Sequence, residues 1–285
     1  MSFRSHLPAK YRQPLGRARD LGIVTLARAA ASGLRMLPDS VLLAVRQRTQ
    51  QLRTMDYVET PIHLYVDSDQ DRLVRLHAVQ KEPETVAWIR NTIRPGDVLY
   101  DIGANIGSYS LIAATFAQYK ISVYAFEPSY ANYMQLNRNI QANAFEGVIT
   151  PLPVALWKDN GLRSFRYSTL DTGSAFHGVQ TDNGDHRVSA AYVQPVLTYR
   201  LDDFVAQFGL KAPTHLKVDV DGEELEILRA SVGCLTQPSL RTILVEVIEE
   251  NIGPIVELLE SFGFVVTSKH WHEGTRAWNA ILSRS

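Results

Sequence analysis

The sequence is poor in the features that support disulfides, membrane spans or strong electrostatic fields. Cys234 is the only cysteine among 285 residues, so the chain can form no intrachain disulfide. No apolar run is long enough to cross a bilayer, and no secretory signal is recognisable. The net charge of −1 provides no overall positive field for nucleic acid. We therefore expect a cytoplasmic protein, peripheral to a membrane at most, with no nucleic-acid partner.

The pattern of apolar segments predicts a mixed α/β fold. Short apolar or alternating runs that read as strands are separated by longer segments with helical periodicity. The predicted strands are 98–100, 121–126, 148–156, 215–220, 243–247, 264–267 and 277–282, and the predicted helices are 84–93, 108–117, 130–142, 201–208 and 223–230. Strands that alternate with helices favour a parallel sheet covered by helices on both faces. Pro151 and Pro153 indicate that the third strand lies at a sheet edge.

Basic residues are concentrated at the N-terminal end. Residues 1–53 carry ten lysines and arginines against two aspartates, a net charge of +8, which leaves −9 for the remainder. Residues 21–36 and 41–52 are predicted to form two helices. They could be an arm that contacts an acidic protein or a membrane surface. A solvated helix pair packed on the rest of the chain is the alternative, and we favour it.

The segment after these helices is predicted to be a strand pair. Residues 62–66 and 73–78 alternate between apolar and polar side chains, with an Asp-rich turn between them. We therefore divide the chain into a mainly helical, basic N-terminal extension with a hairpin, residues 1–80, and a second domain, residues 81–285.

One stretch combines a strand, a glycine-containing turn and the start of a helix. The run Asp101-Ile102-Gly103-Ala104-Asn105-Ile106-Gly107 joins the first predicted strand to the helix at 108–117. Such a unit presents backbone N–H groups to a bound cofactor. We predict that the cofactor contacts the members of this loop, namely Asp101, Gly103, Ala104, Asn105, Ile106 and Gly107.

The loop sequence favours one class of cofactor over another. A dinucleotide site requires Gly-x-Gly-x-x-Gly, whereas Asn105 stands at the middle glycine and the Asp101 carboxylate precedes the loop. That carboxylate would repel a pyrophosphate and attract an ammonium group. S-adenosylmethionine carries an ammonium, a sulfonium and a ribose diol. An NAD-type oxidoreductase on a similar fold remains the alternative.

The end of the second predicted strand supplies a partner for a ribose. Glu127 follows the strand 121–126 and lies about 20 residues after Gly107, the spacing of one strand–helix–strand crossover. An acidic residue at this strand tip can accept hydrogen bonds from both ribose hydroxyls. We predict that Glu127 holds the cofactor ribose, with Pro128 beside it.

Four blocks in this order resemble a known family. They are Asp101–Gly107, Ala125–Pro128, Leu201–Phe204 and Lys217–Glu224. Together they look like the motifs of FkbM-type methyltransferases over about residues 80–270. The resemblance implies a Rossmann-like, seven-stranded methyltransferase sheet and S-adenosylmethionine as methyl donor. It also implies O-methylation of a hydroxyl on a sugar, glycoconjugate or natural-product small molecule.

The resemblance implies two further cofactor contacts. Glu82 lies where the family has an acidic residue near the cofactor, although a charge at a helix N-terminus explains it equally well. Many methyltransferases hold the adenine amino group with an Asp or Asn at the end of the third strand. Ala155 and Leu156 stand there instead, so we expect the adenine to rest on apolar contacts and backbone around Ala155.

The fourth strand carries the residues that we predict to be catalytic. A hydroxyl loses its proton as it attacks a methyl group, so a base is needed. Asp219 is expected near the cofactor and Asp221 near the acceptor, as base, unless Asp221 only caps the following helix. Lys217 is expected either to keep Asp219 ionised or to reach the substrate. Asp219, Asp221 and Glu246 together could hold Mg²⁺, but no ligand spacing indicates it, and we predict no metal.

Residues 161–200 do not fit a simple crossover. Segments 162–167 and 191–199 could be strands, and a long polar segment that runs to Asp185 lies between them. Such a segment in a compact domain is typically a lid over a functional site or disordered. His177 within it is a candidate base, although a lone histidine in a loop is more often a surface residue. A scaffold that binds a cofactor without turnover, or an oligomer assembled through the basic N-terminal arm, also fits the sequence.

Overall fold

The computed structural model describes residues 17–49, 51–175, 177–180, 190–272 and 277–284. These residues form two compact units, one containing the described residues up to Leu52 and the other those from Arg53 onward. Of the polar segment predicted between 167 and 191, residues 176 and 181–189 lie outside the described residues. Within them, no helix is both long and apolar enough to span a membrane.

The first unit is helical, as the sequence predicted. It contains α1 (Arg17–Leu34) and α2 (Asp39–Arg48), separated by a break whose last residue, Pro38, is the N-cap of α2. The second helix ends at Arg48 rather than at Leu52 as predicted, because Leu52 begins a strand, β1 (Leu52–Thr54).

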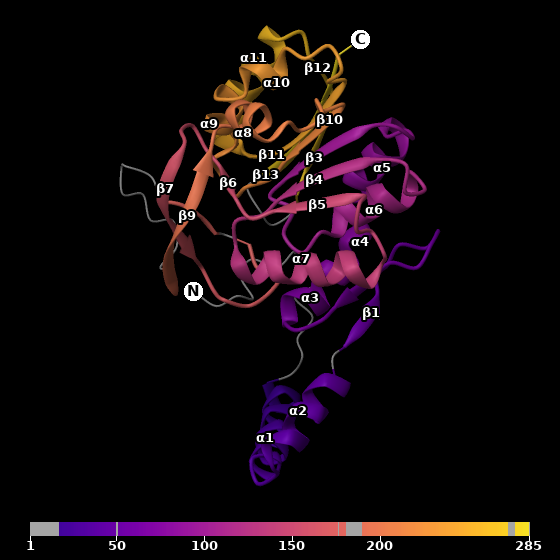
Figure 1. The fold of residues 1–285 in the computed structure, drawn as a ribbon, viewed down its shortest axis with the longest axis vertical. Coiled ribbons are helices and arrows are strands. Elements are labelled where there is room, and N and C mark those ends of the chain that lie inside the picture. Colours follow the sequence, from indigo (N-terminus) through magenta and orange to yellow (C-terminus); the bar gives the residue numbers. More distant parts are fainter. Residues whose placement is uncertain (1–16, 50, 176, 181–189, 273–276, 285) are drawn as a thin grey trace. The chain divides into compact units, whose positions relative to one another are not determined.

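The second unit is built on a seven-stranded sheet (Figure 1). The strand order is β12-β13-β11-β10-β3-β4-β5. The bounds are β3 (Val98–Ile102), β4 (Ser122–Phe126), β5 (Ile149–Leu152), β10 (His215–Val218), β11 (Thr242–Ile248), β12 (Val265–Trp271) and β13 (Ala277–Ser283). The strands from β11 to β5 are parallel, and β13 runs antiparallel to both β11 and β12. This confirms the predicted seven-stranded α/β fold, with the proline-containing β5 at an edge.

Helices cover both faces of this sheet. Alternate residues of its strands point to opposite faces, so the sheet contributes to two hydrophobic cores. Leu99 of β3 joins one hydrophobic core, whereas Tyr100 and Ile102 join the other. The first core lies under α5 (Pro83–Thr92), α6 (Ser108–Phe116) and α7 (Tyr130–Ala142). The second core lies under α8 (Leu201–Phe208), α9 (Glu224–Arg229), α10 (Val232–Leu235) and α11 (Ile252–Ser261), which follows the short helix η4 (Glu249–Asn251).

The strand order places a crevice between β3 and β10. From β3 the chain passes outward to β4 and β5, and it later returns to β10 on the other side of β3. Loops at the carboxyl ends of β3 and β10 therefore diverge at this switch point, which is where open α/β sheets bind ligands. The glycine loop and the Asp219–Asp221 segment are these two loops.

A second, four-stranded sheet occupies much of the 161–200 region. Its order is β6-β9-β7-β8, formed by β6 (Ala155–Leu156), β7 (Gly161–Tyr167), β8 (Gly178–Val179) and β9 (Tyr192–Tyr199). The prediction of one strand over 148–156 was wrong, because the chain leaves the large sheet at Pro153 and enters the small one as β6. Figure 1 shows the small sheet, labelled β6, β7 and β9, beside the labelled helices α8 and α9.

The predicted hairpin at 62–66 and 73–78 was half wrong. The first strand exists as β2 (His63–Tyr65), but it pairs with β1. The second segment is helical and forms α3 (Asp69–Leu73), η3 (Arg75–His77) and α4 (Ala78–Lys81). The reason is local: Ser68 and Asp71 make a capping box in which each side chain accepts a hydrogen bond from the other residue's backbone N–H. This pattern starts a helix where the alternation suggested a turn.

Candidate active site

The glycine loop holds the tips of β3 and β10 together. Gly103 has φ of +82°, and a Cβ atom there would overlap the carbonyl oxygen of Asp219. The Asp219 backbone N–H donates to the Ile102 carbonyl at 2.9 Å. Only glycine allows this approach, so the loop sequence fixes how close the two strand tips lie.

Asn105 links the glycine loop to Glu127. Its φ is +53°, a left-handed conformation that asparagine tolerates better than most residues. In this conformation the Asn105 backbone N–H donates to Glu127 Oε2 at 2.8 Å, and the side-chain amide donates to the Ser174 carbonyl at 2.8 Å. One residue therefore connects the glycine loop, the tip of β4 and the segment ahead of β8.

Glu127 is buried yet lines a pocket. Its other oxygen, Oε1, accepts the Ser129 backbone N–H at 2.8 Å, and the residue is 5% exposed. Burial raises the pKa of this carboxyl to about 7, although both backbone hydrogen bonds act to lower it. Each oxygen keeps a lone pair, so Glu127 can accept two more hydrogen bonds from a ligand.

The pocket extends along the strand tips and under the small sheet. Its walls include the glycine loop, the end of β4, the β5–β6 connection and the loop after β10. The lining residues are Ile102, Gly103, Asn105, Phe126, Glu127, Pro128, Asn132, Val154, Ala155, Leu156, Trp157, Phe165, Ser174, His177, Gly178, Val179, Asp219, Val220, Asp221, Glu223 and Ile227. Carboxylates therefore lie along the large sheet, and aromatic and aliphatic side chains face them from the small sheet.

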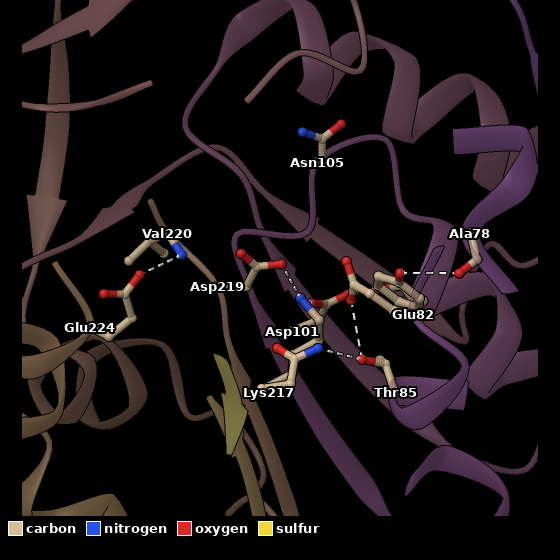
Figure 2. Close-up of polar contacts among 12 residues, drawn as sticks. Ala78, Glu82, Thr85, Asp101, Asn105, Lys217, Asp219, Val220 and Glu224 are labelled. Carbon is tan, nitrogen blue, oxygen red and sulfur yellow. Dashed lines mark hydrogen bonds and ion pairs between the residues drawn. The ribbon is translucent and has the colours of Figure 1, made fainter. Parts of the chain in front are cut away.

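A buried ion cluster lies beside this pocket, at the switch point (Figure 2). Lys217 pairs in register with Asp101 on β3, and its Nζ lies 3.8 Å from Asp101 Oδ1 and 2.8 Å from Asp219 Oδ2. Asp101 Oδ2 accepts the Ser110 hydroxyl at 2.6 Å. Burial lowers the pKa of Lys217, but the charges of Asp219 and Asp101 raise it by more than burial lowers it. The ammonium therefore stays protonated.

Asp219 is held ionised in this cluster. Burial raises the pKa of its carboxyl, but the charge of Lys217 and a hydrogen bond from Glu246 lower it well below its usual range. The Glu246 carboxyl donates in that bond, and burial together with the Asp219 charge raises the pKa of Glu246. A carboxylate with a depressed pKa is a poor proton acceptor. Asp219 therefore provides a fixed negative charge and is not suited to act as the base.

Glu82 completes the cluster from the start of α5. It is fully buried, forms an ion pair with Lys81 and accepts the Thr85 hydroxyl at 3.1 Å. Burial raises the pKa of Glu82, and the charges of Lys81 and Lys217 lower it to a net value below its usual range. Both Glu82 and Asp101 lie outside the pocket lining, in contact with the lysines rather than with the open pocket.

Asp221 stands apart from the cluster, in an unusual conformation. It is exposed, lines the pocket and has φ of +65°. Left-handed backbone at a residue other than glycine is costly and often occurs at functional sites. Glu224 holds the loop after β10 in place: its Oε1 accepts the backbone N–H groups of Gly222 at 2.8 Å and Val220 at 3.3 Å. Burial raises the pKa of Glu224 to about 7.

His177 faces the pocket from the small sheet. Its Nδ1 accepts the Ser168 backbone N–H at 3.2 Å, and the residue is 9% exposed. Burial lowers the pKa of His177 to about 4, so the ring is neutral at pH 7 and weakly basic. Because Nδ1 is an acceptor, the proton of the neutral ring lies on Nε2.

The segment 172–174 fastens the small sheet to the rest of the site. The Asn132 side chain accepts the Gly173 backbone N–H at 2.9 Å and donates to the Ser174 carbonyl at 3.1 Å. From the other side, Arg75 Nε donates to the Gly173 carbonyl at 2.8 Å, and Thr172 donates its hydroxyl to Asp71 at 2.5 Å. The wall that carries His177 is therefore held against the glycine loop.

Most of the predicted site residues come together in one pocket. Its lining includes Gly103, Asn105, Glu127, Pro128, Ala155, His177, Asp219 and Asp221. Ala104, Ile106 and Gly107 shape the loop behind it, and Lys217, Asp101 and Glu82 form the adjoining cluster. Among the described residues, no group of three or more His, Cys, Asp or Glu side chains is arranged to hold a metal ion.

The sequence analysis missed four residues of this site. Asn132 and Glu224 hold loops in place, while Trp157 and Ser174 line the pocket and each carries a buried polar atom with no hydrogen-bond partner among the described residues. Position was the one signal for three of them: Asn132, Trp157 and Glu224 each lie within two residues of a predicted strand end or helix start, whereas Ser174 does not. Nothing in their spacing marked them further.

Comparison with known proteins identifies relatives of this chain. The methyltransferase FkbM domain model matches residues 101–266. Hexuronic acid methyltransferase AglP of Haloferax volcanii is 28% identical over 62% of this chain and 66% of its own length, just under two thirds. The 31-O-demethyl-FK506 methyltransferase FkbM of Streptomyces tacrolimicus is 28% identical over 62% of this chain and 76% of its own.

A solved structure resembles the chain as well. The crystal structure of a methyltransferase FkbM from Methylobacillus flagellatus KT superposes with a TM-score of 0.49 at 14% identity, covering 67% of this chain and 44% of that one. The family match begins at Asp101 in the glycine loop and ends at Val266 in β12, and so contains both loops of the switch point. Since this match covers more than half of the sequence, the chain belongs to the FkbM methyltransferase domain family.

Proposed function

We propose that the protein is an S-adenosylmethionine-dependent O-methyltransferase that acts on a hydroxyl group of a sugar or another hydroxylated small molecule. The observation that carries this proposal is the position of Glu127. Its carboxylate is fixed at the tip of β4 by two backbone N–H groups and keeps two lone pairs for a ribose diol. Asp221 lines the same pocket on the far side of the glycine loop.

An ionised carboxylate in the pocket suits the positive charge of S-adenosylmethionine. Within the cluster beside the glycine loop, Asp219 both lines the pocket and is held ionised, so its carboxylate can pair with a cationic group of a ligand. When bound, S-adenosylmethionine supplies a methyl group on a positively charged sulfur. Glu127 would hold its ribose, and the Asp219 carboxylate would pair with its positively charged end.

We assign the role of general base to Asp221. As the acceptor oxygen forms its bond to the methyl group, the hydroxyl proton has to leave, and the Asp221 carboxylate takes it. The ion pair of Lys217 with Asp219 holds the loop after β10 in place and keeps the Asp219 carboxylate ionised. His177, with its lowered pKa, is the weaker candidate for this role.

The names of the relatives and the pocket lining both support the proposed acceptor class. One relative is named for a hexuronic acid and another for an O-demethyl compound, both of which carry oxygen functions. The carboxylates of Asp221 and Glu223 at the acceptor end can accept hydrogen bonds from several hydroxyls. A panel of sugars, uronic acids and hydroxylated natural products, incubated with S-adenosylmethionine and followed by mass spectrometry, tests this. One added methyl group together with S-adenosylhomocysteine supports the proposal, and no product from any acceptor contradicts it.

A further inference from the structure

The order of the strand tips predicts where the cofactor base must lie. Neighbouring strands are about 4.8 Å apart, so the pocket passes from β10 over β3 and β4 to β5 in steps of that size. If Glu127 at β4 holds the ribose and Asp221 after β10 serves the acceptor, the base lies on the opposite side of Glu127. That end of the pocket is lined by the β5–β6 connection and the small sheet.

This end of the pocket has apolar walls. Leu156, Phe165 and Val179 line it and provide flat and aliphatic surface for the faces of an aromatic ring. Ala155 and Leu156 stand where a carboxylate or amide side chain would be able to accept from the adenine amino group. Polar recognition of the base must therefore come from elsewhere on these walls.

Two N–H donors are present on these walls. The Trp157 side chain is 3% exposed, lines the pocket, and its Nε1 has no hydrogen-bond partner among the described residues. His177 also lines the pocket, and its Nδ1 is occupied by the Ser168 backbone N–H, which leaves the proton on Nε2. A buried N–H without an acceptor is costly, so the unpaired indole of Trp157 itself indicates a ligand atom.

We propose that Trp157 and His177 recognise the adenine ring of the cofactor, each donating an N–H to a ring nitrogen. The inference rests on the proposed function, since it takes S-adenosylmethionine as the ligand. The ring nitrogens N1, N3 and N7 of adenine are acceptors, which match two donors, and the apolar walls enclose its faces. In this arrangement His177 is a cofactor-binding residue that donates a hydrogen bond, and the acceptor proton is left to Asp221.

Calorimetric titration of the full-length protein with S-adenosylhomocysteine tests this assignment without turnover. Trp157→Phe keeps the aromatic ring and removes the donor. His177→Asn keeps an oxygen that can accept the Ser168 N–H and removes Nε2. Each variant is expected to weaken binding about three- to tenfold, the effect of one neutral hydrogen bond. Trp271→Phe and His270→Asn, on β12 and outside the pocket lining, serve as matched controls and should bind as the wild type does.

Analogues in which one ring nitrogen is replaced by carbon identify the contacted atom. The wild-type protein should bind the 1-deaza, 3-deaza or 7-deaza analogue that lacks the contacted nitrogen more weakly, and the matching variant should show no further loss with it. Thermal unfolding of each variant checks that the fold is retained.

The outcomes separate this inference from the proposed function. If the wild type binds S-adenosylhomocysteine and both variants bind it equally well, the adenine assignment is wrong and the proposed function stands. A raised KM for the acceptor with unchanged cofactor affinity would place these donors at the acceptor and would also overturn the assignment. If the folded wild type does not bind S-adenosylhomocysteine at all, both proposals fail.

Discussion

Lys217 and Asp101 lie opposite each other on the neighbouring strands β10 and β3, with Nζ 3.8 Å from Oδ1. The lysine is 2% exposed, and Asp219 lies on its other side at 2.8 Å. Figure 2 shows the three side chains converging where the two strands end. One buried ammonium therefore compensates carboxylates from both loops of the switch point.

Replacing this ammonium should destabilise the protein strongly. Lys217→Met retains most of the side-chain length but leaves the buried Asp101 and the partly buried Asp219 without their cation. Loss of one partner from a buried pair costs about 3–5 kcal/mol, which urea denaturation can measure. Lys120→Met, at an exposed lysine, is the control. A loss below about 1 kcal/mol, the range of an exposed ion pair, would show that Lys217 does not compensate the cluster.

Asp221→Asn should separate chemistry from binding. The asparagine cannot take the acceptor proton, so kcat should fall by about 100-fold or more, the usual contribution of a general base. Affinity for S-adenosylhomocysteine should stay within about twofold, because in this account Asp221 contacts the acceptor rather than the cofactor. Rate measurements under saturating donor, with Asp39→Asn as control, decide this. Full activity in the variant would remove Asp221 from the role of base.

Glu224 should make stability depend on pH. Its pKa is about 7 in the folded protein against an ordinary value of 4.5, so the folded state holds the proton more tightly than the unfolded chain. Stability is then greatest below pH 4.5 with respect to this group and falls as the pH rises toward 7, by up to roughly 3 kcal/mol. Glu127, whose pKa is also about 7, contributes in the same direction.

Glu224→Gln should remove its share of this dependence. The amide oxygen can still accept the Gly222 N–H, while no buried charge forms at high pH. We expect the variant to be more stable than wild type at pH 8 and similar at pH 5, in urea denaturation at both pH values. Glu260→Gln, at an exposed position, is the control. An equal pH dependence in wild type and variant would contradict the buried, protonated state of Glu224.

The central sheet could be predicted because its strands carry their own signals. Segment 98–100 is a continuous apolar run and 243–247 is interrupted only by Glu246, and strands buried on both faces need such a pattern. The hairpin prediction failed at residues 73–78 because a capping box at Ser68 and Asp71 overrides the alternation that follows it. Periodicity alone does not tell which of two competing local signals determines the secondary structure.

The contacts around the site depend on register, which the sequence does not reveal. The pair of Lys217 with Asp101 exists because β10 lies beside β3 in one particular alignment. Likewise Gly161 pairs with Thr198: the strands at 162–167 and 191–199 could be predicted, but not the pairing that makes them a wall of the pocket. The glycine loop and Glu127 were predictable because each lies at a strand end that the sequence marks by itself.

The central claim is that Glu127 binds the ribose of S-adenosylmethionine. Two hydrogen bonds to a charged acceptor are at stake, each contributing about 1.5–3 kcal/mol. Glu127→Ala should therefore weaken binding by at least roughly tenfold. Because the pKa of Glu127 is about 7 and a carboxylate accepts better when ionised, wild-type affinity should rise between pH 6 and pH 8.

The most direct measurement is calorimetric titration of S-adenosylhomocysteine into wild type, Glu127→Ala and Glu127→Gln at pH 6 and pH 8. Our account predicts binding to the wild type that strengthens with pH, a loss of at least roughly tenfold in the alanine variant at pH 8, and a flatter pH profile in the glutamine variant. Unchanged affinity in Glu127→Ala, with the fold retained in thermal unfolding, would contradict the placement of the cofactor in this pocket.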